Sequence, residues 1–292
     1  MSDPRGLMLI DKPKGLTSHD VVARTRRSLH TRKVGHAGTL DPMATGLLVL
    51  GVGRGTKLLT HAVGLAKSYE ATVRLGIATS TDDAEGEVVS KRGCTSIAGL
   101  DRALLDFRGD IMQVPASVSA IKVGGKRAYA LARAGADVKL KARPVTVSKL
   151  EVIGRPRFLD CDESNVAVVD IDVTLDCSSG TYVRAIARDL GDVLGTGGHL
   201  TALRRTQVGP WSVREAGEDL IDLGAACLAL FPEVIDVDDS GANAFRHGSS
   251  TFAGESSAPL TKGASVVCNG HVLGIAKVKE GRLSPAFIID PA

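Results

Sequence analysis

Asp41 is the residue whose setting most clearly suggests chemistry, because it is the one carboxylate in the glycine-rich stretch VGHAGTLDPMATGLLVLGVGRGTK (34–57). The turn-forming pair Gly38-Thr39 precedes it and Pro42 follows it. Proline fixes its own φ and disfavours helical geometry in the residue before it, so the backbone sets where the Asp41 side chain points. A carboxylate held in this way can serve as a nucleophile or a base. Aspartate before proline is also a common turn former, and the local pattern alone leaves both interpretations open.

The end of the same stretch does not form a nucleotide-binding loop. In GVGRGTK, Thr56 stands where both the P-loop motif and the dinucleotide fingerprint need a glycine. The five cysteines are widely spaced without CxxC or Cys/His clustering, and the seven histidines include no HxxxH pair. We therefore expect reduced cysteines, and the sequence gives no support for a catalytic metal.

Size and charge bound the class of protein. At 292 residues and 43% hydrophobic composition, the chain can form one large core with a small appended domain. No apolar run approaches the ~20 residues of a membrane span, so we expect a cytoplasmic protein without membrane attachment. Residues 1–60 carry ten Lys and Arg against four Asp, although the net charge is only +3. This asymmetry suggests a nucleic-acid partner, but basic residues that only solubilise the surface would look the same.

The elements that must position Asp41 can be read from periodicity. Segment 17–30 begins with cap-type residues and ends in basic ones, which predicts a helix. The apolar run 47–52 predicts a strand, and the alternating segments 69–77 and 169–177 predict half-buried strands.

A second helix follows the strand at 169–177. The segment TYVRAIARDLGDVLG (181–195) places Arg184 and Arg188 four residues apart on one face, opposite an apolar stripe. Arg184 thus begins a helix directly after a strand that ends in SSG, and a solvated helix face is the alternative to a role in a site.

Two further regions differ in composition from the rest. Between about 86 and 143, a short predicted helix precedes a glycine-broken segment with seven basic residues and one acid, which favours contact with nucleic acid over an ordinary solvated excursion. After residue 233, the hairpin signals Asn269-Gly270 and Glu280-Gly281 predict a small β-rich domain, which is brief and slightly acidic. The composition leaves open whether this domain adds to nucleic-acid affinity or simply caps the preceding core.

Five motifs together resemble the TruB family of tRNA pseudouridine synthases over residues 7–215: DKPKGLTSHDVV, RKVGHAGTLDPMATGLLVLGVGRGTK, SYEATVRLGIATSTDDAEG, SSGTYVRAIARDLG and HLTALRRTQVGPW. The resemblance implies an isomerase that converts the uridine conventionally numbered 55, in the T arm of tRNA, into pseudouridine. Such an enzyme breaks the bond from ribose C1′ to uracil N1, turns the base and rejoins it through C5, without cofactor or metal.

The resemblance also implies an architecture. We expect an α+β fold with a mixed, mostly antiparallel sheet and flanking helices. A catalytic domain at 1–233 would contain a basic thumb-like insertion at about 86–143, and a PUA-like β-rich domain would follow at 234–292. The partner would be tRNA, bound by a monomer with no obligate protein partner.

Residue by residue, the resemblance assigns a site. Asp41 is the essential residue, which attacks C1′ or the uracil ring or removes a proton from C2′. Arg184 is its partner and keeps the carboxylate ionised beneath a base, while Tyr69 stacks on the flipped uracil. The other matched positions bind RNA or shape the pocket: His36 at the T loop, Tyr182 and Leu203 at the pocket, Lys12 and Lys57 at phosphate or in local structure, and Arg204 and Arg205 at the RNA backbone.

Two other classes of function fit parts of this pattern. A non-catalytic tRNA-binding or RNA-folding protein would use the basic N-terminal part but would leave Asp41 and Arg184 without a role. A nucleoside hydrolase or glycosidase would need a second carboxylate near Asp41, and nothing local to the motif offers one.

Overall fold

The computed structural model of the protein describes residues 3–116, 122–123, 126–127, 140–161, 165–252, 263–279 and 281–292. Most of the basic segment predicted to contact RNA lies outside these residues, so that interpretation stays a prediction. None of the described helices is both long and apolar enough to cross a membrane.

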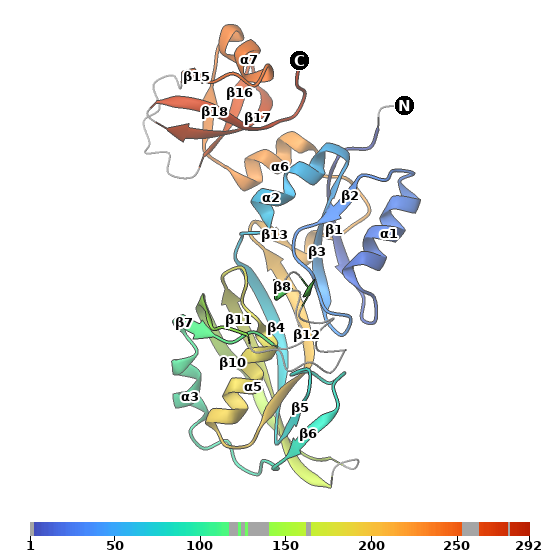
Figure 1. The fold of residues 1–292 in the computed structure, drawn as a ribbon, viewed down its shortest axis with the longest axis vertical. Coiled ribbons are helices and arrows are strands. Elements are labelled where there is room, and N and C mark those ends of the chain that lie inside the picture. Colours follow the sequence, from blue (N-terminus) through green and yellow to red (C-terminus); the bar gives the residue numbers. More distant parts are fainter. Residues whose placement is uncertain are drawn as a thin grey trace.

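The main body is built on one large sheet (Figure 1). Its strands are β1 (Gly6–Lys12), β2 (Val34–His36), β3 (Thr45–Val52), β4 (Lys67–Leu75), β7 (Gly109–Gln113), β10 (Arg143–Cys161), β11 (Val166–Cys177), β12 (Gly198–Val208) and β13 (Trp211–Ser212). Their order is β1-β3-β12-β4-β11-β10-β7, with β2 beside β3 and β13 beside β12. The β3–β12 pair is parallel and the other pairs of this sheet are antiparallel. The predicted mixed, mostly antiparallel sheet is therefore confirmed.

Helices flank the sheet, and two small hairpins extend from it. The remaining elements of this body are α1 (Ser18–Ser28), η1 (Gly53–Lys57), α2 (Leu59–Ala62), β5 (Ile77–Thr79), β6 (Val88–Lys91), α3 (Leu100–Asp106), β8 (Lys122–Val123), β9 (Lys126–Arg127), α5 (Val183–Val193), η2 (Val213–Glu215) and α6 (Leu223–Leu230). Helix α1 starts at a capping box, in which Thr17 and Asp20 satisfy each other's backbone N–H groups. The helices predicted at 17–30 and 181–195 are thus confirmed.

Burial explains why the strands differ in pattern. In β4 and β11 alternate residues are buried, and the other face carries polar pairs such as Arg74 with Asp170. Strand β3 is covered on both faces: Leu48 and Leu50 belong to the buried cluster that includes residues of α1, whereas Leu47 and Val49 belong to a second cluster with residues of α2 and α6. A strand buried on both sides needs apolar residues throughout, which accounts for the continuous run LLVLGV.

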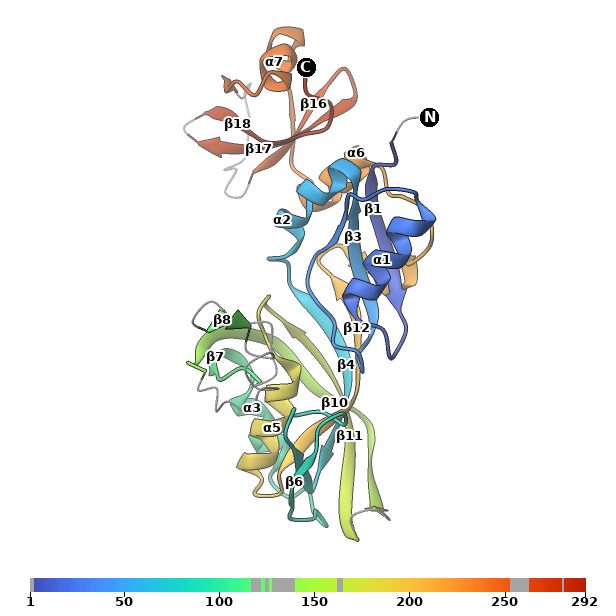
Figure 2. The same ribbon diagram turned by 45° about the vertical axis from the view of Figure 1, so that its right-hand side comes forward.

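A separate five-stranded sheet lies beyond α6 (Figures 1 and 2). It consists of β14 (Val234–Asp236), β15 (Thr251–Phe252), β16 (Ala264–Cys268), β17 (His271–Lys279) and β18 (Arg282–Ile288), with α7 (Asp239–Arg246) packed on it. Asn269 and Gly270 both have positive φ and join β16 to β17, which confirms the predicted hairpin and the β-rich domain. The boundary at 233/234 stays a prediction.

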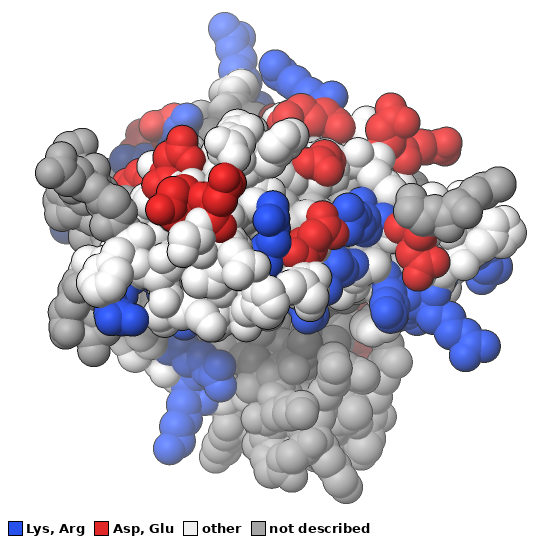
Figure 3. Space-filling view, turned by 90° about the horizontal axis from the view of Figure 1, so that it is seen from above, with Lys and Arg blue, Asp and Glu red and all other residues white. Residues whose placement is uncertain are grey.

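Charge on this end of the molecule is mixed. Figure 3 looks onto it from above and shows acidic and basic side chains interspersed on the near face, with further Lys and Arg at its margins. In and beside β14 and α7 of this domain, Asp236, Asp238 and Asp239 are all exposed. A polyanion would meet no uniformly basic surface on this face.

Candidate active site

A cavity of about 260 Å³ lies where the loop after β2 faces β4, β12 and the start of α5. Its walls come from segments that are far apart in the sequence, and they include six of the predicted site residues: Asp41, Tyr69, Tyr182, Arg184, Leu203 and Arg205. The structure therefore brings together the residues on which the predicted chemistry depends.

At one wall, Arg184 bridges two carboxylates. Its Nε lies 3.0 Å from Oδ2 of Asp41, and its Nη1 lies 3.3 Å from Oδ2 of Asp83. The side chains of Arg184 and Asp83 are about 95% buried, whereas that of Asp41 is 38% exposed. Asp41 is thus the member of the trio that an incoming group can reach.

The electrostatics of Asp41 are a balance of opposing effects. Burial raises the pKa of the Asp41 carboxyl above its ordinary value, Arg184 works against that rise, and the neighbouring Asp83 adds to it. The guanidinium is therefore the main group that favours the ionised carboxylate in this cavity.

Arg184 is fixed from several directions. Its Nη1 donates to the carbonyl of Thr81 at 2.7 Å. Just before it, the side chain of Gln113 on β7 accepts from the Tyr182 N–H at 2.8 Å and donates to the Tyr182 carbonyl at 3.0 Å. These contacts hold the first turn of α5, so the guanidinium has little freedom to leave Asp41.

The loop at 81–83 was missed by the sequence reasoning, although it lies within the motif TSTDDAEG. Asp83 pairs with Arg184 and Asp82 pairs with Arg188 at 3.0 Å, so the arginine face of α5 packs on this loop rather than facing solvent. Two consecutive aspartates, matched by two arginines four residues apart on a helix, were the available signal.

Asp83 also supplies the second carboxylate that nothing local to the motif offered. It does not line the cavity, and Thr81 Oγ1 and the Glu85 N–H donate to its Oδ1 at 2.6 and 3.0 Å. A carboxylate engaged in this way is badly placed as the acid of a glycosidase. Among the described residues, no group of three or more His, Cys, Asp or Glu could hold a metal ion.

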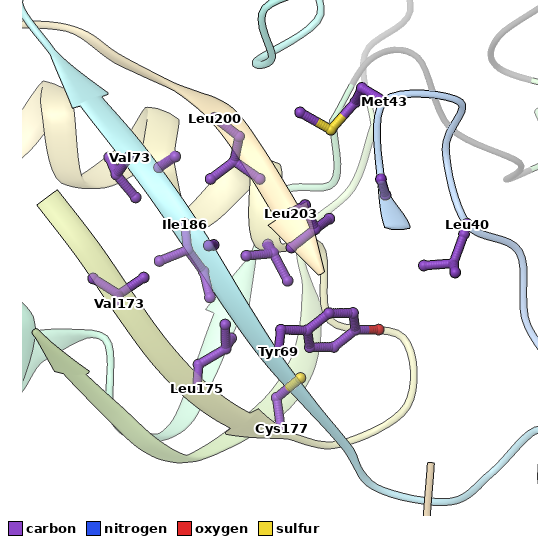
Figure 4. Close-up of a cluster of buried hydrophobic side chains, with 14 of the residues drawn as sticks. Leu40, Met43, Tyr69, Val73, Val173, Leu175, Cys177, Ile186, Leu200 and Leu203 are labelled. Carbon is purple, nitrogen blue, oxygen red and sulfur yellow. The ribbon is translucent and has the colours of Figure 1, made fainter. Parts of the chain in front are cut away.

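Tyr69 and Leu203 form an apolar wall of the cavity. Figure 4 shows Tyr69 at the edge of the buried cluster, near Cys177 and Leu203, with its hydroxyl directed toward the side of Leu40. Burial raises the pKa of the Tyr69 hydroxyl, so the ring is held as a neutral phenol. A flat ring beside a carboxylate is the surface that a planar base would stack on.

Lys12 and His36 lie behind the loop that carries Asp41. Lys12 is fully buried, and its ammonium donates to the carbonyls of Leu16 at 2.7 Å, Pro13 at 3.0 Å and Pro42 at 3.4 Å. These contacts match local structure, one of the two roles predicted for Lys12, rather than phosphate binding. His36 is outside the cavity wall, its ring contacts His19 edge-on, and burial lowers its pKa, which favours the neutral form.

Three residues were predicted to contact RNA outside the base pocket. Lys57 and Arg204 lie away from the cavity, and Arg205 is buried. Lys57 is exposed at the end of η1 and does not line the cavity. Arg204 pairs with Asp11 at 2.7 Å and lines a second cavity instead. Arg205 is only 1% exposed, so a direct contact with the RNA backbone does not fit its position. Successive strand residues point to opposite faces, which is why only one of this arginine pair can reach solvent.

Comparison with known proteins agrees with this arrangement. The family model described as TruB family pseudouridylate synthase (N terminal domain) matches residues 26–183, and that of the tRNA pseudouridylate synthase B C-terminal domain matches residues 184–229. The protein named tRNA pseudouridine synthase B from Arthrobacter sp. (strain FB24) is 48% identical over 303 residues, covering 98% of this chain and 97% of its own. Its namesake from Corynebacterium diphtheriae is 48% identical over 304 residues, with coverages of 98% and 97%.

Among solved structures, the crystal structure of a Cbf5-Nop10-Gar1 complex contains a similar chain, with a TM-score of 0.70 at 21% identity. The match covers 98% of this chain and 85% of that one, and at 21% identity it shows that the two chains share a fold. Fold, cavity and the carboxylate–arginine pair together define a pseudouridine synthase. Within this class the chain belongs to the TruB family, because the family model spans more than half of it and relatives match nearly its whole length. The resemblance inferred from the motifs is confirmed.

Proposed function

We propose that the protein isomerises uridine 55 in the T arm of tRNA to pseudouridine, as a cytoplasmic monomer that needs no cofactor. The observation that carries the proposal is that one cavity joins the Asp41–Arg184 pair, 3.0 Å apart, to Tyr69, Tyr182 and Leu203. The full-length relatives named tRNA pseudouridine synthase B support tRNA as the substrate.

The cavity suits a single base taken out of the RNA stack. Its volume of about 260 Å³ lies below the range of about 300–1,000 Å³ that drug-sized ligands occupy. Tyr69 would stack on one face of the uracil, while Leu203 would close the apolar side. Base flipping explains why an enzyme acting on folded RNA needs so enclosed a site.

Asp41 is the group that starts the reaction. Its carboxylate either attacks C1′ or the uracil ring, or removes the C2′ proton, and the C1′–N1 bond breaks with its electron pair staying on the uracil. After the base turns, C5 bonds to C1′ and Asp41 is regenerated: its bond to C1′ or to the ring breaks, or the proton that it took returns to C2′. The C5 proton then leaves and N1 takes up a proton. Atoms balance without hydrolysis or redox change, so the residues of this cavity suffice.

A non-catalytic RNA-binding protein would gain little from this arrangement. The ion pair is internal to the protein, and its Arg184 side chain is only 6% exposed, too enclosed for an ordinary phosphate contact. An ionised carboxylate at a binding surface would repel RNA phosphates.

The test uses tRNA transcribed with uridine carrying tritium at C5, because only rejoining through C5 expels the label. We expect release of one tritium per tRNA, and chemical mapping of pseudouridine should locate it at position 55. A transcript with cytidine at position 55 is the matched control and should release none. Release from another position, or hydrolysis to free uracil, would overturn the assignment.

A further inference from the structure

Arg205 is a buried cation that the proposed chemistry does not use. Its guanidinium donates to backbone carbonyls of two segments: Nε to Leu47 on β3 at 2.7 Å, Nη2 to Gly38 at 3.2 Å and Nη1 to Thr39 at 3.5 Å. Among the described residues, the ion pairs include none with Arg205. Burying a charge without a counter-ion is costly, so its contacts must serve a purpose that a neutral side chain would not.

Gly38 and Gly46, at the two ends of the loop that carries Asp41, both lie against Arg205. Gly46 has φ +99°, and a Cβ there would lie 2.2 Å from the Arg205 carbonyl oxygen. Gly38 has φ +93°, and a Cβ there would lie 3.7 Å from Arg205 Nη1. The backbone of Arg205 therefore sits against one end of the loop and its side chain against the other. Arg205 therefore contacts both ends of the loop 38–46 and fixes the distance between them.

Arg205 is also a strand neighbour of Tyr69, at the opposite wall of the cavity. It pairs with Tyr69 across β12 and β4, so the two side chains lie on the same face of the sheet. Burial raises the pKa of the Tyr69 hydroxyl, and the interaction with Arg205 acts against that rise. The guanidinium of Arg205 thus holds the loop that carries the carboxylate, and it lies on the same sheet face as the ring proposed to stack on the base.

We propose that Arg205 is a positioning residue, which fixes the Asp41 loop and the Tyr69 ring relative to each other so that a flipped uridine meets both in the reactive geometry. The inference rests on the proposed function. It replaces the expectation that Arg205 contacts the RNA backbone.

The effect on Asp41 would pass through the backbone rather than through space. The groups that shift the pKa of Asp41 most are its own burial, Arg184, Asp83 and Lys12, and Arg205 is not among them. Thr39, whose carbonyl Arg205 holds, lies two residues before Asp41. Loss of that contact would therefore let Asp41 move away from Arg184, and its carboxylate would lose part of what keeps it ionised.

The variant Arg205→Lys tests this, because an ammonium keeps the charge but cannot reproduce a planar fork spanning two segments. We expect the single-turnover rate of tritium release to fall about 10- to 100-fold, with tRNA affinity changed less than about threefold. The acid limb of the pH–rate profile should move to higher pH, a change that simple loss of stability would not cause. Arg108→Lys is the matched control: Arg108 donates to the Leu150 carbonyl at 2.9 Å, outside the cavity, and its replacement should leave rate and profile unchanged.

Gly38→Ala is a second variant that leaves Arg205 in place. A Cβ there meets only ordinary contacts, so the strain comes from φ alone, and we expect a slower rate at unchanged affinity. A wild-type rate in folded Arg205→Lys, or equal losses of rate and affinity with an unshifted profile, would overturn the inference. If Arg205→Lys does not fold, a wild-type rate in Gly38→Ala would do so. Absence of tritium release from the wild-type protein would instead refute the proposed function.

Discussion

The variant Arg184→Gln should shift the pH dependence of the reaction as well as slow it. Two unit charges about 4 Å apart interact by about 4 kcal/mol at an effective dielectric constant of ~20. Because the Asp41 side chain is 38% exposed, solvent screening reduces this, and we take about 2 kcal/mol, which corresponds to roughly a 30-fold change in ionisation equilibrium. Loss of the cation removes the main effect that opposes burial, so the pKa of Asp41 rises further.

The expected result is an acid limb displaced upward by roughly one to two pH units. Activity at neutral pH falls by a factor on the order of 30 or more, with partial recovery at alkaline pH. Tritium release measured at a series of pH values, with tRNA affinity measured in parallel, gives both quantities. Arg157→Gln is the control, since Arg157 pairs with Asp172 on the sheet outside the cavity. Losses of rate and binding that are equal at every pH would refute the reasoning, because Arg184 would then act as a contact to RNA.

Three further outcomes follow from other buried charges. Asp83→Asn should move the acid limb to lower pH, because Asp83 contributes to the raised pKa of Asp41; a limb that stays or rises would contradict this. Lys12→Met should reduce the free energy of unfolding by about 2–3 kcal/mol and so lower the thermal midpoint, because three loop carbonyls lose their donor. An unchanged midpoint would show that these hydrogen bonds do not stabilise the protein. Burial lowers the pKa of Lys67 to about 8, so unfolding takes up a proton between about pH 8 and 10.5 and stability should rise with pH there. Chemical denaturation of Lys67→Met should lack that rise, and a rise equal to wild type would exclude Lys67 as its source.

Local patterns predicted the elements well where burial follows a simple period. The strands at 69–77 and 169–177 alternate because one face is buried, and the helix at 181–195 carries a clear apolar stripe. Pairing Asp41 with Arg184 came from the resemblance to a family, since nothing in the local sequence links residues 143 positions apart. The structure joins them through the cavity.

What was missed depends on contacts between distant segments. Asp83 became part of the site only because α5 packs on the 81–83 loop, which no periodicity reveals. Arg204 and Arg205 were both expected at the RNA backbone, yet strand geometry buries Arg205. The parallel β3–β12 contact, which brings Arg205 to Gly46, is likewise a property of the whole sheet.

The most direct measurement compares Asp41→Asn with wild type on C5-tritiated tRNA while binding is followed in the same samples. Asparagine keeps the shape of the side chain and removes its charge and basicity. The account predicts no tritium release above background from Asp41→Asn, with tRNA affinity within a few-fold of wild type. Release at the wild-type rate would contradict it, because the reaction would then not need the carboxylate that Arg184 holds in the cavity.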